Sequence, residues 1–279
     1  MPSPSSISHL PSSSSEAQRA SLLDSFRIQL RVIGALLMRD VLTRFGRHNI
    51  GFMWMFVEPM IFTLGVTVLW NIIGLHKGDG ITITAFILTG YSTLLLWRNV
   101  PGRCVMALQP NFSLMFHRAV TPIDVFISRI MLEVVGATIS FVILTTVFHA
   151  IGLVPLPYDY AMVWGAWLLL AWYAGALGML IGALSEQSEV VDKLWHPAMY
   201  LLIPLSGSFS MASALPPAFR DVLLLNPTVH CNEMLRAGFF GPGHEWYYSV
   251  GYVVVFNMAL TLLALAQVRY VSRTMVLSE

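Results

Sequence analysis

The sequence contains few charged residues and few cysteines. Only 11% of its 279 residues are Asp, Glu, Lys or Arg, whereas 56% are hydrophobic. A soluble domain carries about a quarter charged residues, because its surface must stay in water, so this composition excludes an ordinary soluble enzyme. A net charge of +1 without a dense basic stretch excludes a nucleic-acid binder, which must neutralise many phosphates. Two cysteines exclude a disulfide scaffold, and the remaining class is a multi-pass membrane protein.

Motifs of common catalytic sites are absent as well. The sequence has no GxxxxGK[ST] loop and therefore cannot bind ATP through a P-loop. It also lacks HExxH and GxSxG, and His230, Cys231 and Glu233 share one short stretch without the spacing of a zinc site. We therefore expect no catalytic residue, metal or cofactor in this chain. An integral-membrane transferase is the disfavoured alternative, because no cluster of acids or histidines lies at a membrane face.

Six apolar segments are long enough, or nearly so, to cross a bilayer as helices, which takes about 20 residues. They are residues 51–75, 81–108, 125–151, 161–184, 194–211 and 246–268. The predicted fold is thus an all-α integral membrane protein with six transmembrane helices. Residues 1–21 are rich in Ser and Pro without the apolar core of a secretory signal, and we expect a disordered tail there.

Positive charges predict the orientation, because cytoplasmic connections are enriched in Lys and Arg. The N-terminal segment, the connection after the second span and the C-terminal tail hold most of them. The opposite side has only Lys77, Arg220 and Arg236. Both termini are therefore expected in the cytoplasm.

Residues 22–49 are expected to form an amphipathic helix in the membrane interface. Apolar residues recur with helical spacing from Leu22 to Val41, with Arg27 and Arg31 beside them, which suits an anionic membrane surface. A plain membrane anchor without another role is the alternative.

The cytoplasmic connection after the second span is expected to hold a short helix over residues 111–121. Asn111 or Ser113 can cap it, and Phe112, Met115 and Phe116 fall on one face. Such a face suits docking into the groove of a partner protein. A helix folded back on the protein's own surface fits equally well.

Residues 212–243 on the outer side read as two short helices broken at Asn226 and Pro227. Irregular backbone at membrane depth survives only where it is buried in protein or lines water, so a re-entrant hairpin is one interpretation and a surface loop the other. Glu233 and Arg236, three residues apart, can pair on its second arm.

Ionisable residues near the spans are candidate functional residues by default. They are Glu58, Arg98, Arg103, Arg129 and Glu133. All lie toward the cytoplasmic half, and Arg129 and Glu133 can simply pair, so no chain of carboxylates supports a proton-driven carrier.

The fourth span contains a concentration of aromatic residues. Trp164, Trp167, Trp172 and Tyr173 belong to an interfacial belt or the core, or they form stacking surfaces for sugar rings. Ala174, Gly178 and Gly182 form a ridge of small residues for close helix packing.

Two sequence runs carry a resemblance to a known family. The run RDVLTRFGRHNIGFMWMFVEPMIFTLGVTVLW, residues 39–70, resembles the membrane subunit of capsular-polysaccharide ABC exporters, the KpsM-like branch of the ABC-2 permeases. The run NPTVHCNEMLR, residues 226–236, is similar to the pattern before the last span in the wider superfamily. An ABC-2 permease for another cargo, such as O-antigen, teichoic acid or a drug, is the near alternative.

The resemblance implies a homodimeric permease with two copies of a separate ATPase subunit, which bind the ATP and Mg. It implies export of a lipid-linked acidic polysaccharide across the bacterial inner membrane, toward a periplasmic co-polymerase and an outer-membrane export protein. Candidate residues for the cargo channel are Arg98, Arg103, Trp164, Trp167, Trp172 and Tyr173. Those for the interfacial helix and the gate through which lipid enters are Arg27, Arg31, Arg39, Arg44, Arg47, His48 and Glu58. Those for coupling to the ATPase are Phe112, Met115, Phe116, His117 and Arg118, and those for a periplasmic gate are Asn226, Pro227, Glu233 and Arg236.

Overall fold

The computed structural model describes residues 22–45, 50–73, 81–115 and 120–277, and every regular element within these ranges is helical. The predicted tail of residues 1–21 lies outside them. The long helices are α1 (Leu22–Phe45), α2 (Ile50–Ile73), α3 (Ile83–Cys104), α5 (Pro122–Ala150), α6 (Tyr160–Ser185) and α10 (Val250–Leu277). The shorter ones are η1 (Gln109–Asn111), α4 (Phe112–Met115), α7 (Glu189–Leu202), η2 (Pro204–Ser206), η3 (Ala212–Ala214), α8 (Pro217–Leu223) and α9 (Pro227–Phe240).

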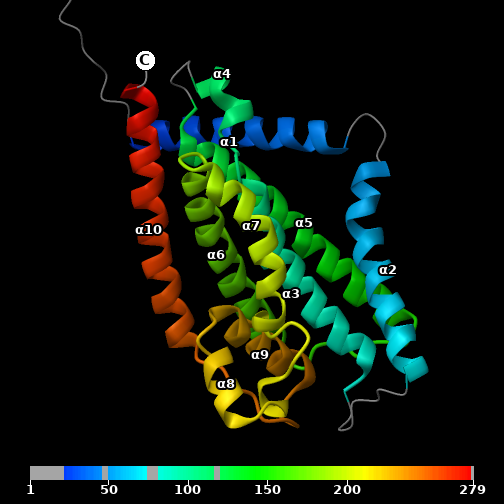
Figure 1. The fold of residues 1–279 in the computed structure, drawn as a ribbon. Helices are drawn as coiled ribbons and strands as arrows, with labels where there is room; N and C mark the ends of the chain where they lie inside the picture. Colours follow the sequence, from blue (N-terminus) through cyan, green and yellow to red (C-terminus); the bar gives the residue numbers. More distant parts are fainter. Residues whose placement is uncertain (1–21, 46–49, 74–80, 116–119, 278–279) are drawn as a thin grey trace, which may run out of the picture.

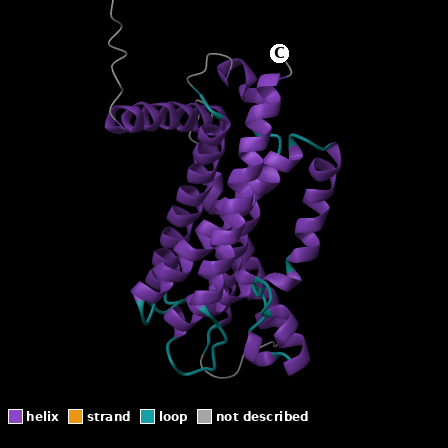
Figure 2. Cartoon of the chain, turned by 90° about the vertical axis from the view of Figure 1, so that its left-hand side faces the viewer, coloured by secondary structure: helices purple, strands orange, loops and turns teal. Residues whose placement is uncertain are grey.

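The helices form a bundle with two distinct ends. Helices α2, α3, α5, α6 and α10 run along its long axis, and α1 lies across one end together with α4 and the C-terminal end of α10 (Figure 1). Figure 2 shows α1 extending sideways from this end. Helices α8 and α9 lie at the opposite end (Figure 1). The arrangement places the Arg-rich segments at the end that α1 crosses.

Local sequence signals account for the starts of several helices. At α5, the N–H and hydroxyl of Thr121 both donate to the Asp124 carboxylate, at 2.9 and 2.6 Å, and Pro122 follows in the first turn. Asp159 caps α6 by accepting the Met162 N–H at 3.1 Å. Such caps satisfy backbone donors that the first turn leaves unpaired.

Membrane-spanning character is clearest in three helices. In the described residues, Pro122–Ala150, Tyr160–Ser185 and Val250–Thr274 are each long and apolar enough to cross a bilayer, and α2 contributes a shorter apolar stretch, Val57–Trp70. The all-helical fold is confirmed, whereas the number of six spans stays a prediction.

The predicted fifth span, residues 194–211, is wrong as a single helix. Helix α7 begins earlier, at Glu189, and ends at Leu202, after 14 residues. Pro204 cannot donate to the helix ladder, and Gly207 adopts a left-handed φ of 72°. After α7 the chain therefore reaches α8 through the short 3-10 helices η2 and η3 and the irregular backbone around them.

The ridge of small residues on α6 is confirmed as a packing surface. A Cβ on Gly178 would come within 3.1 Å of the Cys104 sulfur, and one on Gly182 within 2.7 Å of the Cys104 carbonyl oxygen. Ala174 is fully buried in the main apolar core. Helices α3 and α6 approach this closely because these positions carry little or no side chain.

Candidate functional site

A buried arginine organises the irregular backbone that follows α7. Arg236 on α9 is fully buried, and its guanidinium donates to the carbonyls of Gly207 at 2.9 Å, Ser210 at 2.7 Å and Ser208. Its Cζ also lies 4.0 Å from the centroid of the Phe86 ring. A planar group with several N–H donors can satisfy diverging carbonyls at once. Arg236 therefore holds the segment 206–210, which we call the carbonyl loop, against α9 and α3.

Other polar residues of α9 bind neighbouring backbone in the same way. Glu233 accepts the N–H groups of Ala212 at 3.0 Å and Tyr247 at 3.2 Å. Asn232 donates to the carbonyl of Ser206 at 2.8 Å. The predicted pairing of Glu233 with Arg236 is therefore wrong: the two side chains bind backbone groups in different segments, and no ion pair joins them.

Asn226 and Pro227 start α9 and anchor its first turn. The Asn226 side chain accepts the Thr228 N–H at 3.1 Å and donates to the Leu205 carbonyl at 3.0 Å, and Pro227 occupies the first helical turn. The break between two short helices predicted there is confirmed. Because α9 is buried along most of its length, these residues hold together the end of the bundle opposite α1, and a gating role for them stays a prediction.

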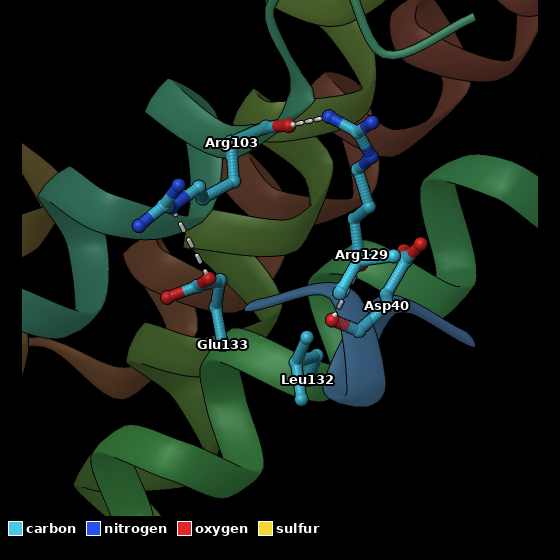
Figure 3. A pocket seen from close by; sticks show the side chains of 6 residues that line it. Asp40, Arg103, Arg129, Leu132 and Glu133 are labelled. Atoms are coloured by element: carbon cyan, nitrogen blue, oxygen red, sulfur yellow. Dashed lines mark hydrogen bonds and ion pairs between the residues drawn. The ribbon is translucent and has the colours of Figure 1, made fainter. Parts of the chain in front are cut away.

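A polar pocket lies where α1, α3 and α5 meet. It has a volume of ≈ 240 Å³ and is lined by Asp40, Thr43, Arg103, Arg129, Leu132 and Glu133. Figure 3 shows Arg103 and Arg129 on neighbouring sides of this pocket. Arg103 Nε lies 3.4 Å from Glu133 Oε1, and Arg129 Nη1 donates to the Arg103 carbonyl at 2.8 Å. The predicted Arg129–Glu133 pair is not formed, because Glu133 binds Arg103.

Arg98 and Arg103 diverge on α3. Arg98 donates to the Tyr200 hydroxyl on α7 at 2.8 Å, with its Cζ 4.7 Å from the Tyr200 ring centroid. Arg103 instead faces α5 and the pocket. The two candidate cargo residues therefore belong to separate sites on opposite sides of α3.

A smaller pocket of ≈ 70 Å³ lies beside the first and shares one carboxylate with it. Its lining includes Glu58 of α2, Asn99 of α3, and Glu133 and Ser140 of α5. Since Glu133 lines both pockets, polar side chains continue from the end of the bundle toward its interior. Glu58 lies on α2, within the first predicted span, and its part in lipid entry stays a prediction.

The four aromatic candidates on α6 do not share one surface. Trp167 is 1% exposed, stacks on Phe141 with centroids 4.7 Å apart and donates to Thr138. Trp164 and Trp172 are partly exposed, and the Trp172 indole donates to Thr261 on α10 at 2.9 Å. Tyr173 is partly buried in the main core. Trp167 is therefore a core residue, and a stacking role stays a prediction only for the others.

Helix α1 is fastened to the bundle by long-range side-chain bonds. Gln29 donates to Asp124 at the start of α5 at 3.0 Å, and Arg39 donates to the side chain of Asn111. Leu36, 5% exposed, packs into an apolar cluster made by α3, α5, α6 and α10. The packed face is centred on Leu36 rather than on the predicted stripe, of which Phe26 and Leu30 are more than half exposed.

The interfacial arginines are placed only in part. Arg27 and Arg31 lie on the exposed surface of α1. The Arg44 side chain and residues Arg47 and His48 lie outside the described residues. Their proposed part in lipid entry stays a prediction.

The predicted coupling helix is described only at its start. Helix α4 covers Phe112–Met115, with Phe112 46% exposed and Met115 packed against the cluster around Leu36. Asn111 does not cap it but donates to the Ala107 carbonyl at 2.8 Å. Phe116, His117 and Arg118 lie outside the described residues. An exposed face and a packed face therefore coexist at the described end.

The comparisons with known proteins decide the family. The sequence profile of the ABC-2 type transporter family matches residues 31–240, most of the chain. The chain belongs to the ABC-2 type transporter family. It is 40% identical over 255 residues to the capsule polysaccharide export inner-membrane protein CtrC of Neisseria meningitidis serogroup B, covering 91% of this chain and 96% of the relative.

Two further relatives of this ABC-2 permease are also named as export or transport proteins. It is 39% identical over 249 residues to the capsule polysaccharide export inner-membrane protein BexB of Haemophilus influenzae, covering 89% of this chain and 94% of the relative. It is 25% identical over 252 residues to the polysialic acid transport protein KpsM of Escherichia coli, covering 88% and 95%. The resemblance inferred from residues 39–70 is thereby confirmed, and the chain is a membrane subunit of an ABC-2 transporter.

Several residues that build this ABC-2 permease escaped the sequence analysis. Glu186 accepts the Leu108 N–H at 2.8 Å, which ties the connection before α4 to the end of α6. Burial raises the pKa of the Glu186 carboxyl, against the lowering effect of that hydrogen bond. Gln29 and Asp124 were likewise missed. No local pattern signals such pairs, because their partners lie 78 and 95 residues apart in the chain.

Proposed function

We propose that this chain is the permease subunit of an ATP-driven ABC exporter that moves lipid-linked capsular polysaccharide across the bacterial inner membrane. The observation that carries the proposal is the 40% identity, over 91% of the chain, to a capsule polysaccharide export inner-membrane protein. The alignment covers almost the whole chain, so the similarity includes the predicted spans, the connections between them and the segment before the last span. Both termini lie in the cytoplasm in this proposal, on the Arg-rich side.

The energy for transport comes from partner subunits. A chain without a P-loop needs a separate ATPase, and we propose a homodimer of the permease with two ATPase copies that bind ATP and Mg. A periplasmic co-polymerase and an outer-membrane export protein continue the path of the polysaccharide. This assembly follows from the resemblance to capsule exporters, and the cytoplasmic end of the bundle offers the surface on which an ATPase can act.

Motion of the ATPases reaches the spans through α4. Phe112 is exposed for contact with a partner, whereas Met115 packs on the cluster that contains Leu36 of α1. The neighbouring residue Asn111 is bonded to Arg39, and Leu108 to Glu186. A displacement of α4 by the ATPase therefore moves α1 and the end of α6 with it, because these contacts connect the three segments directly.

The cargo carries negative charge, and arginines at the cytoplasmic end attract it. Guanidinium groups bind phosphate and carboxylate oxygens with two parallel hydrogen bonds. Arg98 and Arg103 face different sides of α3, so in this proposal they contact the cargo at different points rather than as one clamp.

Affinity purification of the tagged full-length chain from its native membrane tests the proposal. We expect an ABC ATPase subunit to co-purify, and a strain without the chain to accumulate capsular polysaccharide inside the cell. Accumulation of O-antigen, teichoic acid precursor or a drug instead would transfer the chain to another cargo class. Nucleotide hydrolysis by the chain alone would contradict the proposal altogether.

A further inference from the structure

The pocket between α1, α3 and α5 has an unusual balance of charges. Glu133 is bound by Arg103, at 3.4 Å, and Asp40 by Arg39, at 3.1 Å. Arg129 has no carboxylate within ion-pair distance among the described residues, and its one hydrogen bond goes to the neutral Arg103 carbonyl. Both acids of the pocket are thus bound by other arginines. Arg129 forms no direct ion pair with a described carboxylate, and at longer range its charge lowers the pKa of the Glu186 carboxyl after α6, which burial raises.

Geometry favours a compact anion. The cavity of ≈ 240 Å³ exceeds the space that a phosphate group needs. Arg103 is 57% exposed at the rim. Arg129 uses Nη1 in its bond to the Arg103 carbonyl (Figure 3), so its other N–H donors remain for a second acceptor. Arginine binds phosphate oxygens in this bidentate way.

The position in the bundle indicates a lipid rather than a soluble anion. Arg103 lies in the last turn of α3, Arg129 near the start of α5, and Asp40 and Thr43 near the end of α1. These helix ends meet where α1 crosses the bundle (Figure 1), the depth at which headgroups lie for an interfacial helix. Beside the pocket, an exposed apolar stripe descends along α5 through Met131, Val135 and Ile139, and it suits acyl chains.

We propose that this pocket binds the phosphate of a lipid headgroup, with Arg129 as the anion-binding side chain. The inference rests on the proposed function only in that a lipid-linked cargo must present its headgroup at this end of the permease. Two sources share the chemistry: the carrier lipid of the cargo and an ordinary anionic phospholipid. Arg103 stays paired with Glu133 at the rim and keeps the Glu133 carboxylate from repelling the phosphate.

Lipid binding to the purified full-length chain tests the proposal. The chain is kept in a neutral detergent, and its thermal unfolding midpoint is measured against added phosphatidylglycerol, phosphatidylcholine or inorganic phosphate. We expect phosphatidylglycerol alone to raise the midpoint, because the site needs both an anionic phosphate and acyl chains. Arg129→Gln should weaken the apparent affinity for phosphatidylglycerol by about tenfold or more, since it removes charge-assisted hydrogen bonds.

Matched variants keep the test decisive. Lys193→Gln removes a positive charge at the same end of the bundle but from the exposed surface of α7, and it should bind phosphatidylglycerol as the wild type does. Arg129→Lys keeps the charge and should bind with intermediate affinity, which covers the case in which Arg129→Gln fails to fold. Wild-type affinity in both Arg129 variants would overturn the proposal. So would an equal response of the wild type to inorganic phosphate.

A competition experiment distinguishes the two possible lipids, the carrier lipid of the cargo and an anionic phospholipid of the membrane. Purified lipid-linked polysaccharide that displaces labelled phosphatidylglycerol from the wild type identifies the cargo's carrier lipid as the occupant, and absence of displacement identifies bulk phospholipid. Either result is consistent with the phosphate site. Because the assay contains neither ATPase nor transport, its failure leaves the exporter assignment standing, and failure of that assignment leaves the binding result interpretable.

Discussion

Gly90 lies where α3 meets the carbonyl loop, and it has no room for a side chain. A Cβ there would collide with the carbonyl oxygen of Ser208 and lie 2.9 Å from Arg236 Nη2. Backbone cannot yield as the end of a flexible side chain can, so this contact is a fixed constraint on α3. The packing at the end of the bundle opposite α1 thus depends on one position whose side chain is a single hydrogen.

We predict that Gly90→Ala lowers the thermal unfolding midpoint of the purified chain by several degrees. The added methyl must displace the Ser208 carbonyl and so break its bond to Arg236, and overpacking of this kind costs about 1–3 kcal/mol. Gly65→Ala is the control, because no atom lies within 4 Å of a Cβ built there. It should leave the midpoint unchanged or raise it slightly, through the better helix propensity of Ala. Equal effects of both variants would refute the constraint.

Arg236→Lys should also destabilise the chain, although it keeps the positive charge. A single ammonium group cannot reach the diverging carbonyls of Gly207, Ser208 and Ser210 at once, and each buried acceptor left unpaired costs about 1–3 kcal/mol. Arg220→Lys is the matched control: Arg220 is only partly buried and lies over the Tyr247 ring, and its replacement should change the melting temperature little. Limited proteolysis would then show faster cleavage near residues 206–210 in Arg236→Lys alone.

At the scale of elements, α1 and α4 form one mechanical unit at the end of the bundle that α1 crosses. Gln29 bonds α1 to the start of α5, and Arg39 bonds it to Asn111 beside α4. Leu36 adds apolar contact with the ends of α3, α5, α6 and α10. A surface helix held at both of these points moves with the bundle rather than freely in the lipid.

We predict that Gln29→Ala combined with Asn111→Ala loosens this unit without unfolding the bundle. Hydrogen exchange should accelerate in α1 and near α4, because fewer contacts then oppose local opening, while α6 keeps its protection. In cells, surface capsule should fall several-fold as ATPase motion is transmitted less completely. Unchanged exchange in α1 would contradict the role given to these two bonds.

The exposure of Phe112 leads to a separate prediction for the coupling of α4 to the ATPase. Phe112→Asp should sharply reduce capsule export, because a charge in an apolar docking groove is costly to desolvate. Ser113→Asp, at the neighbouring exposed position of α4, controls for added charge and should act more weakly. Export measured together with ATPase activity of the complex distinguishes uncoupling from loss of assembly. Wild-type export in Phe112→Asp would remove α4 from the coupling path.

For the whole molecule, the orientation can be tested without altering the native cysteines. Cys104 and Cys231 are both buried, so they should contribute little background to labelling by a membrane-impermeant maleimide. Leu156→Cys, in the exposed connection between α5 and α6, should react in intact spheroplasts. Glu189→Cys, at the exposed start of α7, should react only after the membrane is opened. The reverse pattern would invert the assignment of cytoplasmic termini.

Long apolar runs were enough to locate most helices, because burial in lipid demands continuous apolar sequence. Residues 125–151 and 161–184 were predicted within a few residues of α5 and α6. The run at 194–211 failed because apolar composition is shared by helices and by buried irregular backbone. Pro204 and Gly207 were the local signals of that break.

Residue roles were predicted less well than elements, since they depend on partners distant in sequence. The short stretch from Asn226 to Arg236 was recognised by pattern, yet its side chains turned out to bind the backbone of the carbonyl loop and of residues near Tyr247. Trp167 looked the same as Trp164 in sequence, and only the packing of α5 beside α6 distinguishes them. Helical spacing gives a direction for a side chain but not what occupies that direction.

The way α1 is attached has a consequence for handling the protein. Its bonds to the bundle pair an amide with a carboxylate and an arginine with an amide, and apolar packing of Leu36 supplements them. None of these is an ion pair of the exposed kind that dissolved electrolyte screens effectively. High-salt washing of membranes should therefore remove loosely bound peripheral proteins from the end of the bundle that α1 crosses, while α1 stays bound to the bundle.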